Sequence, residues 1–208
     1  MASSVPSPPR EGLTPTQWFS DFRDLYNESI ADACTDLGLY YDRYAPPAGA
    51  RPAAGSDSGP VGEEWREVMS RFLEQLARRY DLYQTRTSED GDDLAWLRPG
   101  PSWRVCAVIR QVEEAKDSVL ARDLPEALAS GAEFVVLILY PDSPLPPGIR
   151  SLEHATEHWE RRIAESAVAL GADRPILLAT LSSGCWEHPA PWKASVWEPG
   201  TRSTRRLN

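Results

Sequence analysis

The 208-residue chain lacks the sequence features of membrane, secreted and disulfide-bonded proteins. It has no apolar run of about 18 residues and no apolar stretch like that of a signal peptide. Its three cysteines, Cys34, Cys106 and Cys185, are widely spaced and form no CxxC pair, so no disulfide framework is indicated. We therefore expect a soluble cytoplasmic protein with reduced thiols and no membrane partner.

Several motifs of nucleotide and ester chemistry are also missing. The chain has no Walker loop and no GxGxxG loop, and Ser182-Ser183-Gly184 lacks the G-x-S-x-G pattern of a nucleophile elbow. Acidic residues outnumber basic ones, 31 to 22, so the formal net charge is −9. That charge disfavours broad nonspecific attraction to nucleic acid, although a local basic patch can still supply it.

What is present has the composition of a globular domain, with 41% hydrophobic and 25% charged residues. Residues 1–13 are small, polar and proline-rich, and predict a disordered tail. Residues 14–181 predict a single α/β domain that is interrupted by a Pro/Gly/Ala-rich linker at 42–60. Residues 182–208 form a C-terminal extension rich in tryptophan and proline.

Periodicity along the chain predicts four helices and five strands. The helices are expected at residues 14–38, 61–80, 123–131 and 151–170, and the strands at residues 82–87, 94–97, 105–109, 134–140 and 175–181. Asp123 is interpreted as the N-cap of the third helix, with Pro125 in its first turn.

The order of these elements predicts a mixed sheet with helices on both faces, in which a β-meander precedes strand–helix–strand units. A Pro-Gly-Pro turn at 99–101 between two apolar runs indicates an antiparallel hairpin. The apolar run 134–140 predicts a strand buried on both faces. We expect it to lie in the interior of the sheet, beside 175–181.

The C-terminal extension carries three of the eight tryptophans, Trp186, Trp192 and Trp197. One interpretation is an extended segment that lays these indoles onto the core of the domain. The other is a docking surface for a protein partner, because tryptophan is enriched at interface hot spots. The oligomeric state is left open by the sequence.

Acidic residues stand beside two of the predicted strands. Asp93 opens the second strand, and the third strand leads into the segment RQVEEAK, residues 110–116. With the order helix, β-meander, helix and strand over residues 61–140, this pattern resembles the PD-(D/E)XK, or restriction-endonuclease-like, nuclease superfamily. In that superfamily an aspartate and an acidic-x-Lys triplet bind a divalent metal, which activates water and stabilises charge on the scissile phosphate.

The resemblance implies a magnesium nuclease that acts on DNA. Its metal ligands would be Asp93 with Glu113 or Glu114, and Lys116 would orient the attacking water or steady the phosphate. Strand alternation allows Asp93 to meet Gln111 and Glu113, and an extended or bulged strand would instead bring Glu114 and Lys116 to it.

This chain departs from the family pattern at one position. Arg110 stands where the first acidic residue of the triplet is usual, and Glu114-Ala115-Lys116 follows four residues later. A second hypothesis is therefore a nuclease-like fold with a decayed site and no cofactor, in which Arg110 replaces the metal as a counter-ion. The third is a non-catalytic protein-interaction module that retains the fold. The fourth is an unrelated α/β domain in which these residues form only a solvated turn.

Two other groups of residues suggest zinc. His154, Glu157 and His158 match an HxxEH pattern, but the apolar stripe of the same helix predicts that both histidines lie on its outer face. Cys185 and His188 would complete a three-ligand site with either histidine. Cys106 lies within a predicted strand and is interpreted as a core residue.

Overall fold

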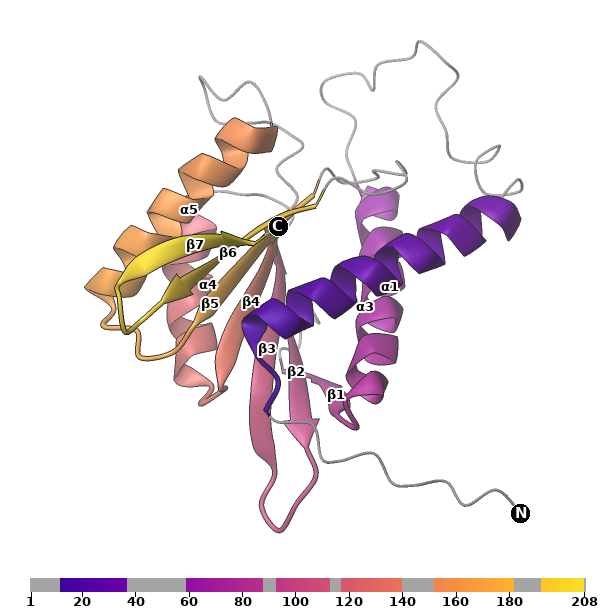
Figure 1. Ribbon diagram of the computed structural model, residues 1–208, viewed down its shortest axis with the longest axis horizontal. Coiled ribbons are helices and arrows are strands. Elements are labelled where there is room, and N and C mark those ends of the chain that lie inside the picture. The colour runs from indigo at the N-terminus through magenta and orange to yellow at the C-terminus, as the bar shows by residue number, and fades with distance from the viewer. Residues whose placement is uncertain are drawn as a thin grey trace.

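The computed structural model describes residues 12–36, 59–87, 93–112, 117–139, 152–181 and 192–207. These residues form a seven-stranded mixed sheet with helices on both faces, so the α/β class is confirmed (Figure 1). The helices are α1 (Pro15–Asp36), α3 (Gly59–Arg79), α4 (Asp117–Ala129) and α5 (Leu152–Ala169). The strands are β1 (Tyr83–Arg86), β2 (Asp93–Arg98), β3 (Arg104–Val112), β4 (Phe134–Leu139), β5 (Ile176–Thr180), β6 (Lys193–Glu198) and β7 (Ser203–Leu207).

The strands lie in the sheet in the same order as in the chain. β1, β2 and β3 form an antiparallel meander, β3, β4 and β5 are parallel, and β6 and β7 are again antiparallel. Parallel neighbours need crossover connections, which α4 and α5 provide. The predicted hairpin and the predicted interior pair of strands at 134–140 and 175–181 are both confirmed for the described residues.

The sheet separates two hydrophobic clusters, because side chains alternate between its faces. On one face α1 and α3 pack against the sheet through Trp18, Phe22, Leu73, Leu76, Trp96, Ile109 and Val136. On the other face α4 and α5 pack through Leu124, Trp159, Ile163, Val108, Leu137 and Leu178. Every residue of β4 is buried, as its apolar run predicts, and each large side chain is worth about 1.5–3 kcal/mol when buried.

Two segments of the predicted extension at 182–208 pair in the same sheet, as β6 and β7. Trp192 lies in the cluster under α1, with its ring centroid 4.7 Å from that of Phe22 in an edge-on contact. Trp197 lies in the opposite cluster, under α5. Both indoles are buried, so they do not form an exposed docking surface, and Trp186 lies outside the described residues. Successive side chains of β6 (KASVWE) point to opposite faces of the sheet, so this strand contributes to both clusters.

Two other boundaries differ from the expected ones. Leu13, placed in the predicted tail, is buried in the cluster under α1. Gly59 and Pro60, the last residues of the predicted linker, begin α3, and the remainder of 42–60 lies outside the described residues. No helix in the described part of the chain is sufficiently long and apolar to span a bilayer.

Helix α4 begins six residues earlier than predicted, at Asp117, and contains Pro125 in its interior. The N-cap assigned to Asp123 is therefore wrong. Proline is favoured in the first turn of a helix and costs about 3 kcal/mol in its interior, so the sequence pattern pointed to a later start. Asp123 is instead a buried residue in the middle of the helix.

Candidate functional site

The predicted site residue Asp93 is directly opposite Arg110 in the β2–β3 ladder. Opposed residues of an antiparallel pair project from the same face of the sheet, so the two side chains meet under α4. The Nε of Arg110 donates to Oδ1 of Asp93, and its Nη2 donates to Oδ2. Both residues are only 6% exposed. This is a bidentate, buried pair, the strongest arrangement that arginine and a carboxylate form.

Helix α4 supplies two more carboxylates to the same guanidinium. Asp123 Oδ1 lies 2.8 Å from Arg110 Nη1, and Glu126 Oε2 lies 3.3 Å from Nη2. The two acids are three residues apart, so one face of the helix presents both to the sheet. We call Asp93, Arg110, Asp123 and Glu126 the Arg110 cluster.

Charge is nearly balanced around this cluster. Arg122, whose side chain is exposed, donates from Nε to Oδ1 of Asp123 at 2.6 Å. Three carboxylates therefore face two guanidinium groups. Because the buried carboxylates are paired, they do not carry the desolvation cost of isolated charges.

The environment keeps Arg110 protonated. Burial alone lowers the pKa of its guanidinium, but the hydrogen bond to Asp93, the charges of Asp93 and Asp123, and the hydrogen bond to Glu126 together raise that pKa above its ordinary value. Arginine is effectively always charged, so Arg110 is a fixed cation in the middle of the acids.

A magnesium ion does not fit the described residues at Asp93. Mg²⁺ needs oxygen ligands at about 2.0–2.1 Å in near-octahedral geometry. Both carboxylate oxygens of Asp93 already accept from Arg110, whose positive charge stands where an ion would bind. In the described ranges, no group of three or more His, Cys, Asp or Glu residues is arranged to hold a metal.

The remaining residues predicted to lie near Asp93 are either outside the described residues or on the other face of the sheet. Glu113, Glu114 and Lys116 lie outside the described residues, so their approach to Asp93 stays a prediction. Gln111 points to the face opposite Asp93, because Arg110, its neighbour, is the residue that shares the face of Asp93. The expected contact of Asp93 with Gln111 is therefore wrong. Gln111 is buried, and its Oε1 has no hydrogen-bond partner among the described residues.

Asp123 and Glu126 were not predicted as residues of the site. Their D-x-x-E spacing was visible, but Asp123 was assigned to a helix cap. An acidic pair at that spacing on a helix that follows a strand with a buried arginine is the signal that identifies them.

The residues considered for zinc do not converge in the described part of the chain. His154 is exposed on α5, and the ring of His158 lies against Trp159 at 4.8 Å. Glu157 accepts from Arg206 Nη2 at 3.1 Å. Cys185 and His188 lie outside the described residues. The predicted outward position is confirmed for His154.

Cys106 is a buried core residue, as its position in a strand predicts. Burial raises the pKa of its thiol, and the negative charge of Glu133 raises it further. The neutral thiol is thus favoured, which is the opposite of what a nucleophilic cysteine needs.

Comparisons with known proteins identify no family. No family model matches the chain, and no curated protein matches it. Among solved structures it is similar to the central domain of yeast acetyl-CoA carboxylase, with 8% sequence identity and a TM-score of 0.42. That match covers 90% of this chain and 35% of the other, so this chain spans about a third of its length. A likeness at this level carries no argument about function.

Proposed function

We propose that this chain is a non-catalytic interaction module with a nuclease-like core, in which Arg110 takes the place of a metal ion. The order α3, β1, β2, β3, α4, β4 and the position of Asp93 at the start of β2 support the nuclease-like core. The bidentate, buried pair of Arg110 with Asp93 carries the proposal, because it occupies the carboxylate that a catalytic metal would require.

Arginine does not replace magnesium chemically. A metal ion lowers the pKa of its bound water and accepts electron pairs from phosphate oxygens, whereas a guanidinium group only donates hydrogen bonds. A working nuclease that uses Asp93, Glu113, Glu114 and Lys116 would first have to displace Arg110. Breaking a buried ion pair by removing one partner costs about 3–5 kcal/mol, which opposes metal entry.

The partner that we propose is a protein rather than DNA, because the net charge of −9 opposes general attraction to a polyanion. Tyr83 on the edge strand β1 and Trp103 are 62% and 57% exposed, and their rings meet edge-on at 5.5 Å. Exposed aromatic side chains of this kind are typical anchors of protein interfaces. Trp186, outside the described residues, remains a proposed second contact.

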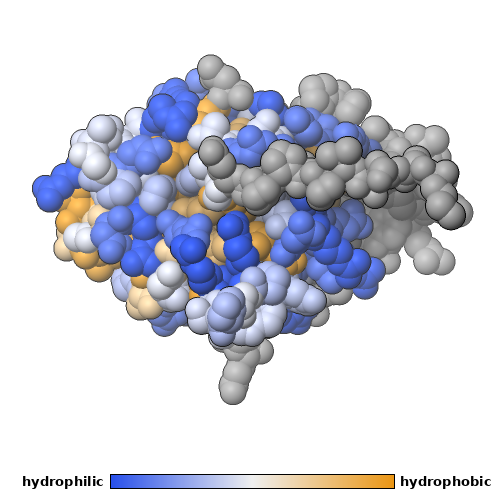
Figure 2. Space-filling view, turned by 60° about the horizontal axis from the view of Figure 1, so that its bottom comes forward, coloured by the Kyte–Doolittle hydropathy of each residue, from blue (hydrophilic) through white to orange (hydrophobic). Residues whose placement is uncertain are grey.

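We include a cytoplasmic location in the proposal. Hydrophilic residues predominate on the face seen in Figure 2, where hydrophobic residues form separate groups between them. The free, buried thiol of Cys106 is also typical of a reducing compartment.

The test is a calorimetric titration of Mg²⁺ and Mn²⁺ into the full chain, combined with a DNA-cleavage assay. We expect no metal binding that depends on Asp93 and no cleavage. Asp93→Ala is the informative variant, and Asp173→Ala is its control, because Asp173 is an exposed aspartate outside the Arg110 cluster. Metal binding and cleavage that are both lost in Asp93→Ala alone would establish the magnesium nuclease instead.

A further inference from the structure

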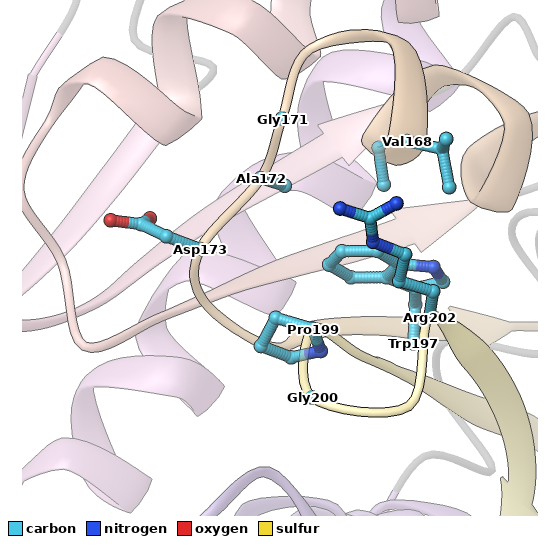
Figure 3. Close-up of a pocket in the computed structure, with 9 residues that line it drawn as sticks. Val168, Gly171, Ala172, Asp173, Trp197, Pro199, Gly200 and Arg202 are labelled. Atoms are coloured by element: carbon cyan, nitrogen blue, oxygen red, sulfur yellow. The ribbon is translucent and has the colours of Figure 1, made fainter.

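A second site lies on the α5 side of the sheet, away from the Arg110 cluster. A cleft of about 370 Å³ separates the end of α5 from the turn between β6 and β7 (Figure 3). Trp197, in its lining, is opposite Ile176 at the beginning of β5, whereas Arg110 belongs to the second half of β3. The cleft and the Arg110 cluster therefore lie toward opposite ends of the parallel strands.

The indole of Trp197 lines this cleft and carries a hydrogen-bond donor that is buried and unused. Trp197 is 2% exposed, and its Nε1 has no hydrogen-bond partner among the described residues. A buried donor without a partner costs about 1–3 kcal/mol. The Nε1 atoms of Trp18, Trp159 and Trp192 are also buried without a partner among the described residues, and Trp197 is the one of the four that lines this cleft.

Arg202 provides a positive charge above that indole. Figure 3 shows its side chain reaching over the ring of Trp197. Among the ion pairs of the described residues none involves Arg202, whereas Arg205 and Arg206 on the neighbouring strand are both paired. The carboxylate of Asp173 points away from Arg202 and lies 2.8 Å from Arg174 Nε. The charge of Arg202 is thus not neutralised by the acid that lines the cleft.

The backbone conformation of Arg202 is unfavourable for an arginine. Its φ of 51° lies in the left-handed region, where a glycine would be unstrained. Residues held in this region tend to cluster at functional sites. An arginine at this position is therefore strained where a glycine would not be.

We propose that this cleft binds a small carboxylate with an apolar body. The carboxylate would accept hydrogen bonds from the guanidinium of Arg202 and from Nε1 of Trp197, and Val168, Ala172 and Pro199 would contact the apolar part. Nε1 is covered in the structure, so the ligand would reach it only after the exposed Arg202 side chain, which lies over the indole, moves aside and then closes onto the carboxylate. The proposal does not depend on the Arg110 cluster or on the function proposed above.

The test follows the indole N–H signal of Trp197 by NMR in the ¹⁵N-labelled full chain, with Trp197→Phe used for its assignment. Benzoate is the probe, benzamide is its uncharged counterpart, and inorganic phosphate is an anion without an apolar body. We expect saturable shifts of the Trp197 signal with benzoate, and weaker binding of the other two. Arg202→Gly should weaken benzoate binding about tenfold, because it removes a charged hydrogen-bond donor and suits the left-handed turn.

Arg161→Ala is the matched control, since Arg161 is an exposed arginine on α5 that does not line the cleft. It should leave benzoate binding unchanged. A Trp197 signal that does not respond to benzoate would overturn the site, as would equal binding by Arg202→Gly and the wild type. Phosphate or benzamide binding as tightly as benzoate would overturn the proposed ligand class.

Discussion

Two arginines of this chain occupy opposite electrostatic settings. Arg110 is buried under α4 and contacts three carboxylates, and its backbone lies in a regular strand. Arg202 is exposed in a turn, has no ion-pair partner among the described residues, and holds a left-handed backbone. The difference separates a charge that is used within the fold from one that, in our proposal, binds a ligand. An arginine whose guanidinium is paired with carboxylates stabilises the residues around it. An arginine without such partners in a strained turn lowers the stability of the fold.

The largest effect is expected at Arg110. Arg110→Ala should lower the free energy of unfolding by about 3–5 kcal/mol, because it leaves Asp93 buried without a counter-charge and leaves Asp123 with Arg122 alone. Urea denaturation measures the change. Arg122→Ala is the control, since Arg122 bonds to the same Asp123 from an exposed position, and its loss should cost less than about 1 kcal/mol. Equal losses in the two variants would contradict the role given to Arg110.

A double-mutant cycle tests whether Asp93 and Arg110 act as a pair. The double variant Asp93→Ala/Arg110→Ala should lose less stability than the sum of the two single variants, with a coupling of about 1–3 kcal/mol, because the groups are in direct contact. Unfolding free energies of the four proteins give this value. Strict additivity would show that the two residues contribute separately.

A gain in stability, not a loss, is expected when Arg202 is replaced by glycine. Arg202→Gly should raise the free energy of unfolding by about 1 kcal/mol, because glycine adopts the left-handed conformation without strain. Arg202→Ala removes the same guanidinium but keeps the strain, so thermal unfolding should show no such gain for it. If both variants gain equally, the guanidinium rather than the backbone is the source of the cost.

The smallest effect is expected at the exposed aromatic pair. Tyr83→Ala and Trp103→Ala should each cost less than about 1 kcal/mol in the isolated chain, because their rings are mostly exposed. Trp159→Ala, at a buried tryptophan of the cluster under α5, should cost about 3–5 kcal/mol in the same urea measurement. A large loss of stability in Trp103→Ala would mean that the aromatic pair stabilises the fold and is not reserved for binding a partner.

Local sequence signals predicted the interior of the sheet and missed its C-terminal edge. The apolar run of β4 and the Pro-Gly-Pro turn predict their own structures, because composition and turn residues determine them. The six residues of β6 carry only a weak alternation, and their pairing with β5 is a contact with a distant segment. Such pairing is decided by tertiary packing, which no short window of sequence contains.

Only two of the four residues of the Arg110 cluster could be identified from the sequence. Asp93 and the unusual Arg110 were visible from their positions beside predicted strands. Their facing positions depend on strand register, since a shift of one residue would have turned Gln111 toward Asp93 instead. Asp123 and Glu126 join the cluster because α4 packs over β3, and Pro125 directed the helix prediction to a later start.

Whether Arg110 stands in place of a metal ion can be read from its side-chain Nε–H signal by NMR while Mg²⁺ is added to the full chain. We expect this signal to keep its position, because Arg110 remains bonded to Asp93 and blocks the ion. A saturable shift of the signal with Mg²⁺, absent in Asp93→Asn, would show that the metal displaces the arginine, and Arg110 would then not be a substitute for the ion.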